Sequence, residues 1–73
     1  MEQFQLAGRI RAFRKLKGLT QDELARKLGV SIAVLGSIER GTRSADSKML
    51  SKITESLDIE LTELLNTNEQ ERK

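Results

Sequence analysis

The feature of this sequence that most constrains its fold is a small size combined with a complete lack of cysteine and histidine. The chain has 73 residues, with no Cys and no His. A core of this size is marginally stable, and small domains commonly add disulfides, a structural metal or a partner subunit. Disulfides and the usual zinc sites are excluded here. Stability therefore has to come from helix packing, aided by a dimer interface.

Apolar residues recur at helical spacing along the chain, and glycines and capping residues divide them into five helical segments. The first segment carries Leu6, Ile10 and Phe13 on its inner face, with Leu16 as a further member. Gly18 ends this segment, because glycine is a poor helix former.

The second and third segments are short and lie close together in the sequence. In "TQDE", Thr20 is the expected N-cap, and Glu23 three residues later completes a capping box. Gly29 supplies the left-handed residue at the end of that helix. Ser31 is expected to cap the third helix, and Gly41 to end it.

The remaining chain predicts two more helices and no strand. Asp46 caps a fourth helix with an apolar face, and a short fifth helix carries three leucines: Leu61, Leu64 and Leu65. No sustained alternation of apolar and polar residues favours a strand. We therefore expect an all-α fold of five helices in one domain, residues 1–65. Residues 66–73 lack apolar side chains and are expected to form a disordered tail.

Charge is distributed unevenly along the chain. Residues Met1 to Lys52 include 11 basic and 5 acidic side chains, whereas Ile53 to Lys73 include 2 and 6. A basic body suits a polyanionic partner, but an ordinary solvated surface carries the same kind of charges. Phe4 and Phe13 are the two aromatic residues, so stacking on single-stranded bases finds little support.

Enzymatic, metal-binding and membrane functions find no support in the residue types. The chain has no His, Cys or Tyr, no glycine-rich phosphate loop before a helix, and no paired carboxylates at a cleft-forming spacing. It has no run of about 18 apolar residues and no apolar signal-peptide core. We expect a cytoplasmic protein that is not an enzyme and that binds no cofactor, metal or membrane.

The stretch "QDELARKLGVSIAVLGSIER" has the organisation of a helix-turn-helix, two short helices that meet through a turn containing Gly29. Ala25 is small where the two helices are expected to cross. The stretch directly follows "RIRAFRKLKGLT", and nine residues separate it from "LSKITESLDIELTELL". From Leu6 to Leu65 the chain resembles the DNA-binding domains of the lambda-repressor-like family, the phage Cro and repressor type.

The resemblance implies a homodimer that places its third helix in the major groove of double-stranded DNA. The positions that face bases in the family correspond to Ile32, Ala33, Val34, Gly36 and Ser37. The positions that contact the DNA backbone correspond to Thr20, Gln21, Ser31, Arg40, Thr42, Arg43 and Ser44. The resemblance also implies an ion pair, partly buried, between Arg14 and Glu39.

Several basic residues and one glycine have an ordinary structural explanation. Lys15, Lys17, Arg26 and Lys27 are expected to form a solvated face rather than to contact phosphate. Gly36 either permits a close approach of the backbone to DNA or to another helix, or is simply tolerated within the third helix.

Two functions remain open. We expect a sequence-specific transcriptional regulator, a repressor that binds an inverted-repeat operator through the helix at residues 31–40. The alternative is a protein-interaction module, antirepressor or antitoxin-like, that uses the apolar face of the same helix. The homodimer interface is expected at Leu61, Leu64 and Leu65, with Phe4 or Leu16 contributing.

Overall fold

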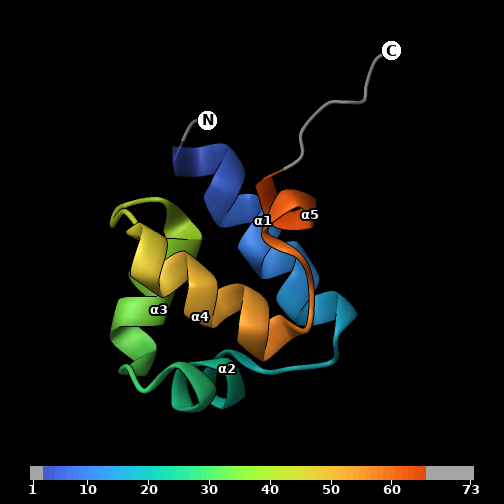
Figure 1. Cartoon of the computed structure of the whole chain (residues 1–73). Helices are drawn as coiled ribbons and strands as arrows, with labels where there is room; N and C mark the ends of the chain where they lie inside the picture. The colour runs from blue at the N-terminus through green and yellow to red at the C-terminus, as the bar shows by residue number, and fades with distance from the viewer. Residues whose placement is uncertain (1–2, 66–73) are drawn as a thin grey trace.

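The chain folds into five helices in the order that the sequence predicts. The computed structural model describes residues 3–65, with side chains from Gln5 onward. The helices are α1 (Gln3–Leu16), α2 (Gln21–Leu28), α3 (Ile32–Arg40), α4 (Ser47–Leu57) and α5 (Leu61–Leu65), as Figure 1 shows. The expected tail at 66–73 and the side chain of Phe4 lie outside the described residues.

The helix ends are fixed by local hydrogen bonds. Thr20, Ser31 and Asp46 are the N-caps of α2, α3 and α4, and in each case the side chain accepts a hydrogen bond from a backbone N–H three residues later. The end of α4 is less expected, because Asp58 adopts the left-handed conformation there with φ 57°. Aspartate tolerates this region better than most residues with a side chain do.

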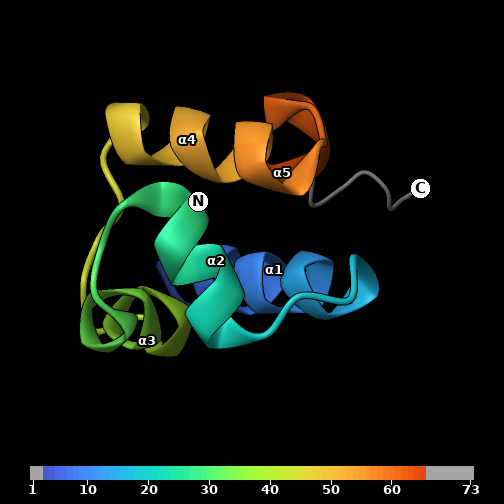
Figure 2. The same cartoon turned by 90° about the horizontal axis from the view of Figure 1, so that it is seen from below.

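The helices enclose one apolar core. In Figure 2, α4 runs along one side of the molecule and α1 and α3 along the other, while α2 closes the end between them. α2 packs against both α3 and α4, and α5 packs against α1 and α4. This arrangement leaves α3 at an outer edge of the molecule, with one face free (Figure 1).

The core consists of apolar residues from every helix. Its fully buried members are Ile10, Leu24, Leu35, Ile53, Leu57 and Leu64. Leu16 differs from the expectation, since it is 76% exposed and does not belong to the inner face of α1. The buried stripe of α1 runs through Ala7, Ile10 and Arg14, and Leu16 lies off this stripe, although it follows Phe13 at a helical spacing.

Candidate nucleic-acid interface

A complete capping box orients the start of α2. The Thr20 hydroxyl accepts from the Glu23 N–H at 3.0 Å, and the Glu23 carboxylate accepts from the Thr20 N–H at 2.8 Å. The hydrogen bond from the Thr20 N–H lowers the pKa of Glu23, because it favours the charged carboxylate. At the other end of α2, Gly29 has φ 74°, a conformation that glycine adopts without a Cβ clash. These two ends set the angle at which the chain enters α3.

α3 has one buried face and one exposed face. Leu35 and Ile38 are buried in the core, whereas Ile32 is 48% exposed and Ala33 is also exposed. The hydroxyl of Ser31 accepts from the Val34 N–H at 3.1 Å and holds the first turn of α3. The exposed face therefore begins at the first residue of the helix, as it must if α3 is to enter a groove.

A buried ion pair ties α3 to α1. Arg14 donates from Nε to Oε2 of Glu39 at 2.7 Å and from Nη2 to Oε1 at 3.1 Å. The two side chains are 10% and 3% exposed. Gln21 Nε2 also donates to Oε1 of Glu39 at 3.1 Å, and Arg14 Nη1 donates to the carbonyl of Leu19 at 2.9 Å. One carboxylate thus connects α1, α2 and α3.

Gln21 consequently has a structural role that the sequence does not reveal. The resemblance implies a contact between this residue and the DNA backbone, yet its amide is half-buried and bonded to Glu39. The second N–H of the Gln21 amide and the amide oxygen remain available for hydrogen bonds to a ligand.

Gly36 lies on the exposed side of α3 but is itself buried. A methyl group in its place would lie 3.1 Å from Nη1 of Arg40 and 3.8 Å from the amide of Gln21. The Arg40 and Gln21 side chains therefore cover the Gly36 backbone. That Gly36 faces bases stays a prediction, and in the unbound protein these two side chains lie over it.

Ser37 and Val34 are exposed to a similar degree but have different surroundings. Ser37 is half-buried and donates its hydroxyl to the carbonyl of Ala33 at 3.0 Å. Val34 is also half-buried and packs against the core. It lines a hollow between α3 and the start of α4, together with Arg43 and Met49. Of the two, Ser37 shares the exposed face with Ala33, four residues earlier on the helix.

The loop after α3 is ordered by α3 itself. The Thr42 N–H and the Arg43 N–H both donate to the Ser37 carbonyl, and the Thr42 hydroxyl donates to the same oxygen at 3.2 Å. Thr42, Arg43 and Ser44 are all exposed. A cation and two hydroxyl groups are thereby held beside the C-terminal end of α3.

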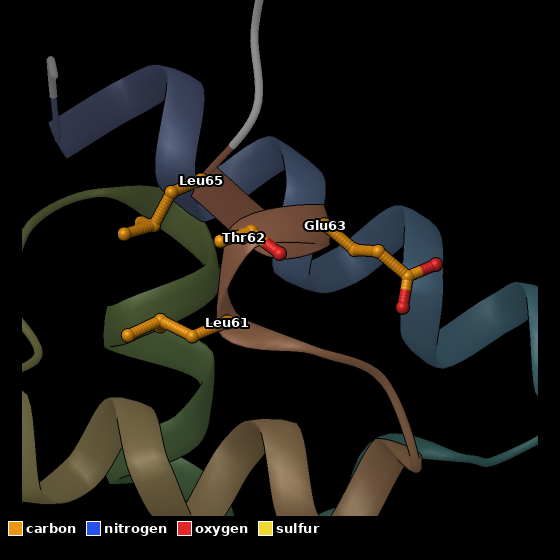
Figure 3. Close-up of a pocket in the computed structure, with 4 residues that line it drawn as sticks. All are labelled: Leu61, Thr62, Glu63 and Leu65. Atoms are coloured by element: carbon orange, nitrogen blue, oxygen red, sulfur yellow. The ribbon is translucent and has the colours of Figure 1, made fainter.

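α5 presents two of its three leucines to solvent. Leu61 and Leu65 are 42% and 36% exposed, but Leu64 is fully buried in the core. Figure 3 shows the side chains of Leu61 and Leu65 extending to one side of the helix and that of Glu63 to the other. Leu64 is therefore not available to a dimer interface, and the prediction for that residue is wrong.

Arg9 is a structural residue to which the sequence assigns no role. It donates to the carbonyls of Leu64 and Glu63 at the end of α5, and its guanidinium lies 5.8 Å from the centre of the Phe13 ring. A cation at a helix C-terminus satisfies carbonyls that lack helical partners. No local sequence signal reveals this contact, because Arg9 and the carbonyls that it binds are more than 50 residues apart in the chain.

Residues 3–65 offer neither a metal site nor a membrane-spanning helix. No group of three or more His, Cys, Asp or Glu side chains is placed so that it could hold a metal ion. None of the described helices has the length and apolar character needed to cross a bilayer.

Comparison with known proteins identifies the arrangement. The helix-turn-helix family model HTH_3 matches residues 10–64. The HTH-type transcriptional regulator YazB of Bacillus subtilis is 48% identical over 56 residues, which cover 77% of this chain and 81% of YazB. The regulator SinR of the same organism is 41% identical over 59 residues, 80% of this chain, so the chain spans about half, 53%, of the length of SinR.

Solved structures share both the fold and part of the sequence. The clp gene regulator ClgR from Corynebacterium glutamicum has a TM-score of 0.83 and 32% identity, over 86% of this chain and 82% of ClgR. A crystal structure of SinR in complex with DNA has a TM-score of 0.77 and 37% identity, over 84% of this chain and 98% of that chain. The chain belongs to the lambda-repressor-like helix-turn-helix family of transcriptional regulators, HTH_3.

Proposed function

We propose that the protein is a DNA-binding transcriptional regulator that inserts α3 into the major groove and acts as a homodimeric repressor at an inverted-repeat operator. The exposed face of α3 carries the proposal. It begins at the first residue of the helix and is held rigidly by the carboxylate of Glu39. The structure of SinR with DNA supports the proposal, since SinR is 37% identical to this chain over the compared region.

The start of α3 is suited to contact thymine. Ile32 and Ala33 are exposed and have no polar group to satisfy, so they can pack against the C5-methyl groups that distinguish thymine in the major groove. Ser37 adds a hydroxyl on the same face, with its oxygen available as an acceptor. We propose that these three residues face the bases.

The surrounding residues are suited to contact phosphates. Arg43 is exposed beside the end of α3, and Thr42 and Ser44 flank it. The N-terminus of α2 lies beside α3 at Gly36 and Glu39, and the N-terminus of α3 begins the exposed face. Free backbone N–H groups at both helix starts favour an anion. We propose that the backbone is bound at Arg43 and its neighbours, and at the helix starts marked by Thr20, Gln21 and Ser31.

The salt dependence of binding tests this function against its alternative. A protein–protein contact through the apolar Ile32 and Ala33 would depend little on salt, whereas each phosphate contact contributes about 0.9 to the slope of log K against log salt. Fluorescence anisotropy with a labelled duplex at several salt concentrations measures this slope. We expect a steep slope that Arg43→Ala reduces by about one.

Failure of the wild-type chain to bind duplex DNA at low salt would contradict the DNA-binding function. It would favour the interaction module, whose exposed apolar residue Ile32 would then contact a protein.

We propose that the dimer forms through the exposed leucines of α5. Leu61 and Leu65 line a surface hollow together with Thr62 and Glu63 (Figure 3). Two subunits related by a two-fold axis would place their α3 helices about 34 Å apart, one turn of DNA. Sedimentation of the wild type and of a Leu61→Ser, Leu65→Ser double variant tests the interface. Leu16→Ser shows whether the end of α1 contributes.

The dimer proposal predicts that the double variant sediments as a monomer at concentrations where the wild type is a dimer. A wild type that stays monomeric at high micromolar concentration, with and without DNA, would contradict it. A dimer that is insensitive to both leucine substitutions would place the interface elsewhere.

A further inference from the structure

The exposed face of α3 has a gap in its row of side chains. Ile32, Gly36 and Arg40 recur at intervals of four residues, so they follow one another along a single stripe of the helix. Ala33 and Ser37 lie beside this stripe. Gly36 is in the middle of the stripe and has no side chain, which leaves room directly above the helix backbone.

Arg40 occupies that room. Its Nη1 lies 3.1 Å from the place that a methyl group at Gly36 would take, and its Nη2 is 3.4 Å from the hydroxyl of Ser37. Long side chains on a helix lean toward its N-terminus, so an arginine in the last turn naturally covers the preceding turn. The guanidinium therefore lies over the middle of the exposed face, and not at its end as the sequence position suggests.

The guanidinium of Arg40 is exposed and has no acidic partner among residues 3–65. The two ion pairs in that part of the chain are Arg14–Glu39 and Arg26–Asp22. The nearby carboxylate of Glu39 is bonded to Arg14 and Gln21. Arg40 thus keeps most of its five N–H donors for a ligand.

We propose that Arg40 reads a guanine base in the major groove. This assignment rests on the proposed DNA-binding function, and it replaces the backbone contact that the family resemblance implies at this position. The fork of a guanidinium matches the O6 and N7 acceptors of guanine, whereas Ile32 and Ala33 make no hydrogen bonds with their side chains. Each half-site would then contain one essential G·C pair beside thymines contacted by the start of α3.

Gly36 contributes to the proposed recognition of guanine by Arg40. A side chain at position 36 would compete with the guanidinium for the same space, so Gly36 permits Arg40 to lie close to the helix. Gly36→Ala adds a methyl group 3.1 Å from Nη1, so the end of the arginine side chain must move away by a few tenths of an ångström. Alanine is also the better helix former. We expect this variant to unfold at the same or a higher temperature than the wild type, and to discriminate less well at the guanine position.

The decisive experiment uses a duplex selected by the wild-type protein. Each G·C pair is changed to A·T in turn, and each guanine is replaced in turn by 7-deazaguanine, which still pairs with cytosine but lacks N7. We expect one position in each half-site where both changes weaken wild-type binding by about 5- to 100-fold. Arg40→Ala should bind the changed and unchanged duplexes alike at that position, whereas Arg40→Lys keeps the charge without the fork and should discriminate less than the wild type. Arg43→Ala is the matched control, and it should bind every duplex more weakly while keeping the full discrimination.

Two results would overturn the assignment of Arg40, and a third would overturn the role of Gly36. The selected sites could lack an essential G·C pair. The Arg40 variants could lose the same factor on all duplexes and keep the discrimination, which would make Arg40 a phosphate contact. Gly36→Ala could keep full discrimination with an unchanged fold, which would remove the role of the glycine. A wild type that binds no duplex would instead contradict the proposed function itself.

Discussion

The ion pair between Arg14 and Glu39 permits a quantitative prediction about how α3 is held. Arg14→Met removes the charge and keeps an unbranched side chain. The carboxylate of Glu39, 3% exposed, would keep a single hydrogen bond, from Gln21. Removal of one partner of a buried pair costs about 3–5 kcal/mol. A domain of this length has a total stability of roughly 4–11 kcal/mol, so the variant should be close to unfolding.

Urea denaturation of four proteins measures this effect: the wild type, Arg14→Met, Glu39→Gln and the double variant. We expect each single variant to lose about 3 kcal/mol and the double variant to lose much less than the sum, because it buries no unpaired charge. The coupling free energy should therefore be about 2 kcal/mol or more. Additive losses, with coupling below about 0.5 kcal/mol, would refute the argument that these two side chains act as a buried pair.

Three further predictions concern the cap, the charge and the core. Ser31→Ala removes the hydrogen bond to the Val34 N–H and should destabilise the domain by about 1 kcal/mol in thermal unfolding. Because the pKa of Glu23 is lowered in the folded protein, its charge stabilises the fold at pH values above the ordinary glutamate pKa of about 4.3. This contribution is lost as the pH falls through the lower pKa that Glu23 has in the folded protein. The stability difference between the wild type and Glu23→Gln should accordingly shrink from pH 6 to below about pH 4 in urea titrations, whereas a constant difference would exclude a role for the charge. Leu64→Ala should cost about 2–5 kcal/mol and Leu16→Ala less than about 0.5 kcal/mol, because the first is fully buried and the second 76% exposed, and equal losses would contradict this placement of the core.

The helices could be predicted because their signals are local. The capping box of Thr20 and Glu23, the caps at Ser31 and Asp46, and the left-handed glycines act within four residues of the chain. The resemblance to a family then supplied the arrangement in space and the pairing of Arg14 with Glu39. Apolar periodicity alone predicts a small helical bundle without saying which face of α3 is free.

The remaining features depend on contacts between distant parts of the chain. Periodicity could not distinguish the buried Leu64 from the exposed Leu61 and Leu65, because α5 has only five residues and its packing partners lie elsewhere. The contact of Arg9 with the end of α5 has the same origin. The cover that Arg40 provides over Gly36 depends on a side-chain conformation, which a sequence pattern does not specify.

The central claim is that the exposed face of α3 binds DNA, and amide chemical-shift mapping tests it most directly. A ¹⁵N-labelled sample is titrated at low salt with an unlabelled duplex of about two helical turns, since non-specific binding uses the same charged surface. We predict that the largest shifts occur at residues 31–44 and around Gln21, with little change in the middle of α4. Large shifts confined to α5 and the end of α1, or no shifts at any duplex concentration, would contradict the claim.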